Sequence, residues 1–98
     1  MKKTEIFSQV LSAVSAATEI DPAEIVSRSR KEEVVEARLL LVHCCTEKGL
    51  RPVQIASLVG HTPHNVYRSL RSAADRYKYS SSFRFDCDLL CKQLGITM

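Results

Sequence analysis

The segment that runs from Pro52 to Leu70 has the sequence PVQIASLVGHTPHNVYRSL, which predicts two short helices separated by a turn. Gly60 can end the first helix, because glycine adopts the positive φ of a helix C-terminus without a Cβ clash. Thr62 and Pro63 can start the second helix, with a hydroxyl cap followed by a proline in the first turn. We therefore expect a helix-turn-helix over about residues 52–77, the unit that offers its second helix to a DNA groove.

Apolar residues recur at spacings of three and four along the rest of the chain, which is the period of an α-helix. They predict a first helix over about residues 4–18, a short second helix after Asp21, and a long helix ending near Gly49. A last helix is expected to stop at Gly95, and no stretch has the alternating pattern of a strand. The predicted fold class is all-α, a small helical bundle of about five to six helices containing the helix-turn-helix.

Three local signals are expected at the ends of these helices. Asp21 with Glu24, and Ser29 with Glu32, have the spacing of capping boxes, in which the two residues satisfy each other's backbone N–H groups. The three serines at 80–82 predict a turn before the last helix. These signals set the expected boundaries of the short, the long and the last helix.

The length of 98 residues, with 45% hydrophobic residues, supports one domain with one modest core. We assign residues 1–98 to a single helical DNA-binding domain. No apolar run approaches the roughly 20 residues of a membrane span, and Glu5 interrupts the basic start that a signal peptide would need. We expect a cytoplasmic protein without a membrane partner, and Met1 with the C-terminal helix favours a complete chain over a fragment.

The net charge of +3 is distributed unevenly along the chain. Residues 1–26 carry two lysines against four carboxylates, a net charge of −2, whereas residues 51–78 carry five basic residues against Asp75 alone, a net charge of +4. Positive charge is therefore concentrated on the predicted helix-turn-helix. This distribution suits a phosphate partner, because neutralising phosphates releases condensed counterions and makes binding fall with salt.

The second helix of the pair separates into two faces at about 100° per residue. Val66, Leu70, Ala73 and Tyr77 form the core face, which leaves the opposite face to solvent or to a ligand. Asn can pair with the adenine edge and Arg with the guanine edge, each through two hydrogen bonds. The residues predicted to contact DNA from this helix are His64, Asn65, Tyr67, Arg68 and Arg71.

The four cysteines are expected to be reduced structural thiols. Cys44 and Cys45 are adjacent and Cys87 and Cys91 lie one helical turn apart, which is unlike a secreted disulfide framework. Adjacent helical residues point about 100° apart, so His43 and both neighbouring cysteines cannot face one centre. We predict no catalytic residue, no metal and no enzyme activity.

A short Asp-Pro-Ala-Glu-Ile-Val segment at 21–26 and a Ser-Arg-rich loop over about 27–31 precede a long helix that begins Glu33-Val34-Val35-Glu36-Ala37-Arg38. With the helix-turn-helix that follows, this order resembles the C-terminal DNA-binding domain of the bacterial replication initiator DnaA over about residues 5–94. In that family the loop makes phosphate and minor-groove contacts, an arginine early in the long helix joins them, and the helix after the glycine enters the major groove. The resemblance gives the first role to Arg28, Arg30, Lys31 and Arg38, and the second to Thr62, His64, Asn65 and Arg68.

Two departures from that family limit what the resemblance implies. The family signature Gly-Arg-Asp-His-Thr-Thr-Val corresponds here to Gly-His-Thr-Pro-His-Asn-Val at 60–66, so we do not expect recognition of the initiator's own site. None of the three glycines belongs to a Walker phosphate loop, so no nucleotide cofactor is expected. The sequence favours a stand-alone DNA-binding domain, regulatory or replication-related, of the kind that a mobile element carries.

The alternative function is a helical protein-protein interaction module. In that case the arginine face meets an acidic partner, or the last helix mediates dimers. Its apolar residues exceed what one core needs, and they are Phe83, Phe85, Leu89, Leu90, Leu94 and Ile96. A DNA-binding monomer of this size makes few base contacts, so a homodimer or a partner protein is also expected beside double-stranded DNA.

Overall fold

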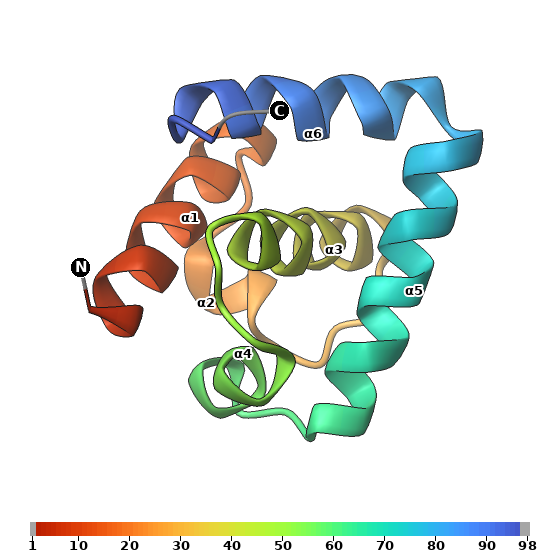
Figure 1. Ribbon diagram of the computed structural model, residues 1–98. Helices are drawn as coiled ribbons and strands as arrows, with labels where there is room; N and C mark the ends of the chain where they lie inside the picture. Colours follow the sequence, from red (N-terminus) through yellow and green to blue (C-terminus); the bar gives the residue numbers. More distant parts are fainter. Residues whose placement is uncertain (1, 97–98) are drawn as a thin grey trace.

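Six helices follow one another along the chain of this computed structural model, which describes residues 2–96 (Figure 1). Within that range there is no strand. The all-α prediction and the expected number of helices are therefore confirmed. The helices are α1 (Lys3–Thr18), α2 (Pro22–Ile25), α3 (Glu32–Glu47), α4 (Pro52–Val59), α5 (Pro63–Tyr79) and α6 (Ser81–Gln93).

Helix α3 is the centre of the bundle, and the other five helices pack around it (Figure 1). It buries half of its 16 residues, including Leu40, Leu41 and Val42, which follow one another and point in three directions. A helix that is apolar on several faces must be covered on several sides. The apolar residues of α3 therefore explain why the other helices surround it.

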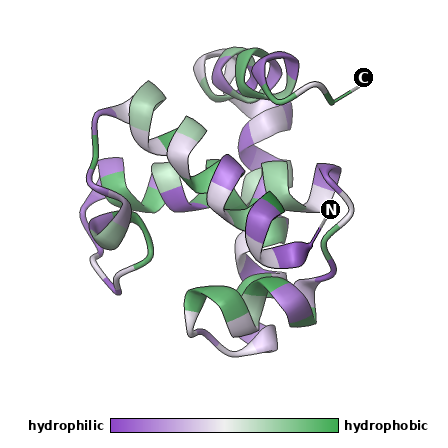
Figure 2. Ribbon diagram, turned by 90° about the vertical axis from the view of Figure 1, so that its left-hand side faces the viewer, coloured by the Kyte–Doolittle hydropathy of each residue, from purple (hydrophilic) through white to green (hydrophobic). Residues whose placement is uncertain are grey.

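One apolar core connects all six helices. Phe7, Ile25, Leu40, Ile55 and Phe83 belong to it, together with Val66 of α5, and every fully buried side chain among residues 2–96 is apolar or a cysteine. In Figure 2 hydrophilic and hydrophobic stretches alternate along the helices, as in amphipathic helices that bury one face. No helix in this part of the chain is long and apolar enough to cross a membrane.

Helices α4 and α5 are joined by the three-residue turn 60–62 and run in clearly different directions (Figure 1). Gly60 adopts φ 73°, and its conformation ends α4 as the sequence predicted. Thr62 Oγ1 accepts a hydrogen bond of 3.2 Å from the backbone N–H of Asn65, which caps α5. The turn between the two helices therefore lies where Gly60, Thr62 and Pro63 predicted it. Helix α5 continues to Tyr79, whereas the sequence predicted an end near residue 77.

The capping box expected between Ser29 and Glu32 is wrong. Lys31 is the N-cap of α3, with no side-chain cap, and Ser29 Oγ accepts a bond of 3.3 Å from the Lys31 N–H instead. The serine stabilises the loop before the helix, because it lies two residues too early to cap it. Asp21 does cap α2, through a bond of 2.8 Å from the Ala23 N–H.

The turn expected over the three serines at 80–82 is also wrong. Ser80 alone separates α5 from α6, and its Oγ accepts a bond of 3.2 Å from the Phe83 N–H, so Ser81 and Ser82 are already helical. A serine hydroxyl at an N-cap satisfies an orphan amide, which lets the new helix begin at once. Arg84 strengthens this corner by donating to the carbonyl oxygens of Tyr77 and Lys78.

Candidate nucleic-acid interface

A groove of about 410 Å³ lies beside α5. Its walls come from four parts of the chain: the loop before α3, the first half of α3, the turn before α5, and one side of α5 itself. Segments about 40 residues apart in sequence therefore share one surface. The lining residues are Arg28, Ser29, Arg30, Val35, Arg38, Leu39, His61, Asn65, Arg68, Ser69, Ser72 and Arg76.

Five of these twelve residues are arginines, and none is an aspartate or glutamate. The loop contributes Arg28 and Arg30, α3 contributes Arg38, and α5 contributes Arg68 and Arg76. Guanidinium groups present several donors in a planar fork that fits phosphate oxygens. Such a concentration of one charge sign in a groove attracts polyanions.

Helix α5 places its groove residues on one side by simple periodicity. Asn65, Arg68, Ser72 and Arg76 are spaced by three or four residues, and such residues share a face of an α-helix. An adjacent side of α5 carries Val66 and Ala73, which are buried in the core. The first turn of α5 contains no acidic residue, so nothing there neutralises the positive end of its dipole.

Arg38 is held by the protein itself. Its Nε donates to the carbonyl oxygen of Ile25 at 3.0 Å, and its Nη2 donates to the carbonyl oxygen of Ser29 at 3.1 Å. Burial lowers the pKa of this guanidinium from its ordinary value. Arg38 therefore ties the basic loop to α3, in addition to lining the groove.

His61 lies in the groove beside the arginines. Burial lowers its pKa, and so do the charges of Arg38 and Arg28, while a backbone hydrogen bond with Val26 acts in the opposite direction. Its Nε2 is buried and has no hydrogen-bond partner among residues 2–96. A histidine with a lowered pKa is neutral at pH 7, so the positive charge of the groove comes from its arginines.

The structure brings five of the ten predicted DNA contacts into this groove: Arg28, Arg30, Arg38, Asn65 and Arg68. The other five lie outside its lining but are all exposed, and Tyr67 exposes 58% of its surface. His64 lies four residues before Arg68 and Arg71 three residues after it, so both extend the exposed surface of α5 beside Arg68. Tyr67 is exposed about 100° further around the helix. The predicted contacts outside the groove are Lys31, Thr62, His64, Tyr67 and Arg71.

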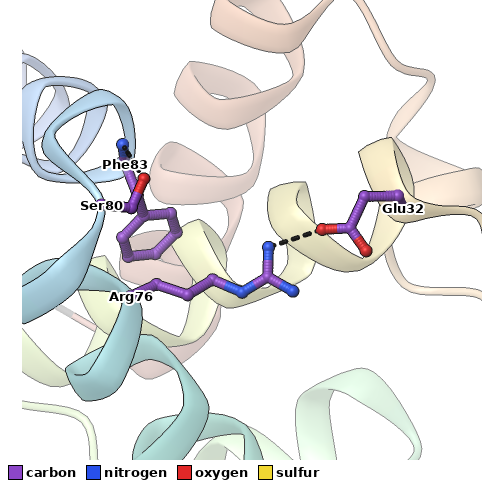
Figure 3. A network of polar contacts seen from close by, with 4 residues as sticks. All are labelled: Glu32, Arg76, Ser80 and Phe83. Atoms are coloured by element: carbon purple, nitrogen blue, oxygen red, sulfur yellow. Dashed lines mark hydrogen bonds and ion pairs between the residues drawn. The ribbon is translucent and has the colours of Figure 1, made fainter.

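Seven lining residues of the groove were not among the contacts predicted from sequence: Ser29, Val35, Leu39, His61, Ser69, Ser72 and Arg76. The signal for two of them was the spacing of four residues from Arg68 to Ser72 and on to Arg76, which places them on the face of Arg68. Arg76 also makes an ion pair, because its Nη1 lies 2.7 Å from Glu32 Oε1 at the start of α3 (Figure 3).

The cysteines do not line this groove and lie inside the core. All four are free and buried. Burial raises the pKa of Cys45 and of Cys87 to about 12, and it also raises the pKa values of Cys44 and Cys91. In the part of the chain that the structure describes, no three His, Cys, Asp or Glu side chains are placed to hold a metal ion. The thiols therefore pack as small apolar groups.

Comparison of the chain with protein-family models, with curated proteins and with solved structures finds no match.

Proposed function

We propose that this protein binds double-stranded DNA through the arginine-lined groove and the exposed side of α5. The observation that carries the proposal is the convergence of five arginines, from the loop, α3 and α5, in one groove without a lining carboxylate. Arginines that merely keep one helix solvated would all lie on that helix. Here two of the five come from a loop about 40 residues away in sequence. The groove suits a strand of the phosphate backbone.

In the proposed complex the N-terminal half of α5 enters the major groove. Asn65 and Arg68 line the arginine-rich groove of the protein. His64 and Tyr67 are exposed near the start of α5, the part of a recognition helix that reaches base edges. The loop with Arg28 and Arg30 then lies over the phosphates beside the major groove. Base contacts supply specificity in this arrangement, and the loop supplies affinity that does not depend on sequence.

This division of roles resembles the C-terminal domain of DnaA, and the proposal includes that likeness. It also includes a regulatory or replication-related role for a stand-alone domain of this kind. The His61-Thr62-Pro63-His64 stretch differs from the family signature at the positions that start the second helix. The proposed target sequence is therefore different from the initiator's own site.

The test is fluorescence anisotropy with a labelled pool of random duplexes at low and moderate salt, followed by selection of the sequences that bind best. We expect enrichment of one short motif and an affinity that falls as salt rises. A Lys92→Ala variant is the matched control, because Lys92 is exposed on α6 and does not line the groove. No binding at low salt would reject the proposal.

A helical protein-interaction module is the second candidate, and one observation favours it. Phe85 and Leu89 lie one turn apart on α6 and expose 66% and 43% of their surfaces, whereas Phe83, Leu90 and Cys91 bury theirs. Exposed apolar side chains on one helix face are typical of protein contacts. Sedimentation of the wild type and of a Phe85→Ser variant tests this candidate, which predicts association that the substitution abolishes.

A further inference from the structure

Arg76 differs from the other arginines of the groove because it already has an anionic partner. Its Nη1 lies 2.7 Å from Glu32 Oε1, and this is the only ion pair among residues 2–96 (Figure 3). Arg28, Arg30 and Arg68 have no carboxylate within ion-pair distance. The fifth guanidinium of the groove is therefore occupied by a group that resembles a phosphate in charge and in hydrogen bonding.

The pair lies at the edge of the groove. Arg76 lines the groove from α5 and exposes 31% of its side chain, whereas Glu32 does not line it and exposes 71% of its side chain at the first position of α3. Figure 3 shows the arginine extended across the gap between the two helices toward the carboxylate. A ligand in the groove therefore meets one side of the guanidinium while Glu32 holds another.

Glu32 is one of two acidic residues in the first turn of α3. Glu33 is the next residue, lies in the same first turn, and is exposed without an ion-pair partner in the described range. An acidic residue in the first turn favours the helix dipole, and Glu33 supplies that interaction as well. What distinguishes the two glutamates is the contact of Glu32 with Arg76.

We propose that Glu32 is a built-in competitor of DNA phosphate for Arg76, which keeps the affinity of the groove below what its five arginines allow. The inference rests on the proposed function and concerns the regulation of that same surface. A phosphate that binds Arg76 must compete with the carboxylate for this guanidinium. The loss is uniform across DNA sequences, because phosphate contacts carry no sequence information.

The size of the effect follows from the exposure of the pair. Ion pairs between solvent-exposed side chains are weak, so a phosphate can displace the carboxylate. Removing the competitor is expected to raise the affinity for DNA about two- to fivefold. It also removes an intramolecular counterion from Arg76, so the dependence of log K on log salt is expected to become steeper, by up to about 0.9.

The experiment compares Glu32→Gln with Glu33→Gln, in the wild type and in an Arg76→Gln background, on one defined duplex over a range of salt. Both glutamine variants remove one negative charge from the same helix turn. The increase in DNA affinity that they have in common therefore measures long-range electrostatics. We expect Glu32→Gln to bind about two- to fivefold more tightly than Glu33→Gln, with the steeper salt dependence. In the Arg76→Gln background the two variants should bind equally.

Equal gains from the two glutamine variants in the wild-type background would overturn the competitor role while leaving DNA binding intact. An advantage of Glu32→Gln that persists without Arg76 would overturn it as well, because the effect would then lie elsewhere. If the wild type and all variants fail to bind duplex DNA at low salt, the proposed function is rejected and this inference with it.

Discussion

Arg38 Nε donates a hydrogen bond of 3.0 Å to the backbone carbonyl oxygen of Ile25, the last residue of α2. The same guanidinium donates to the carbonyl oxygen of Ser29 in the basic loop. One side chain of α3 therefore holds both ends of the segment 25–29. This arrangement uses the fork of an arginine, which a lysine cannot reproduce with its single ammonium group. The two bonded carbonyl oxygens flank Arg28, and Arg30 follows directly after them, so we expect the contact to hold both arginines beside α5.

Replacing Arg38 by lysine is the first test of this relationship. The charge is kept but the two-carbonyl contact is lost, so the loop over residues 26–31 should exchange its amide hydrogens faster and DNA affinity should fall about as much as in Arg38→Ala. Hydrogen exchange with anisotropy on one duplex measures both. Arg28→Lys is the control, since it keeps a charge without such a contact. If Arg38→Lys has the amide hydrogen exchange and the DNA affinity of the wild type, then only the charge of Arg38 matters.

Arg68 and Arg30 are expected to contribute differently to DNA binding. In the proposed complex Arg68 reads a base, so Arg68→Ala should cost about 1–3 kcal/mol on the selected site and much less on unrelated sequences. Arg30 contacts phosphate, so Arg30→Ala should weaken binding on all sequences and reduce the salt slope by about one. Equal losses on every duplex from both variants would reject Arg68 as a base reader.

Gly60 is expected to be the sensitive position of the α4–α5 turn. Its φ of 73° strains any residue with a Cβ, although a Cβ there would meet no other atom within 4 Å. Gly60→Ala should therefore reduce the free energy of unfolding by about 1–2 kcal/mol through backbone strain alone, and Gly60→Asn by less. Urea denaturation measures both, with the exposed Ser57→Ala as control. No loss in Gly60→Ala would contradict the left-handed conformation.

The buried thiols should make the protein less stable in alkali. Burial raises the pKa of Cys45 and of Cys87 from about 9 to about 12, so above pH 9 the unfolded chain releases thiol protons that the folded chain retains. The free energy of unfolding should therefore fall as pH rises from about 9 toward 12. Melting temperatures across this range test the prediction, and Cys45→Ala should show a smaller fall than the wild type.

Two partly buried histidines should make the protein less stable in acid. Burial lowers the pKa of His43, against the opposing charges of Glu47 and Asp88, and it lowers the pKa of His61. Below the ordinary histidine pKa of 6.5 the unfolded chain binds protons that the folded chain does not. The free energy of unfolding should therefore decrease as the pH is lowered below about 6.5. His61→Gln should reduce this dependence in thermal melts between pH 7 and pH 5, and an unchanged profile would contradict it.

The helices of this protein were predictable because their signals are local. Gly60 ends α4, Thr62 and Pro63 begin α5, and apolar spacing identifies the buried faces, all through interactions within about four residues. The errors were local competitions of the same kind. Ser80 capped α6 two residues earlier than a turn over all three serines would allow, and Ser29 bonded within the loop instead of capping α3.

The candidate site was only half predictable. Sequence periodicity placed Arg68 on the face of α5 away from the core, with Asn65 flanking the N-terminal turn, and the basic loop was visible in composition. The contact of that loop with α5 depends on how both pack against α3. The pairing of Arg76 with Glu32, 44 residues apart, depends on the same packing. No local pattern encodes a distance between elements that are far apart in sequence.

The sequence by itself therefore determined the all-α class, the order of the helices and the separate α4 and α5, because caps, glycine and periodicity act through near neighbours. The tertiary structure decided that five arginines share one groove, that Arg38 holds a loop, and that Phe85 faces solvent. These relationships follow from burying the several apolar faces of α3, a requirement that all surrounding helices must satisfy together.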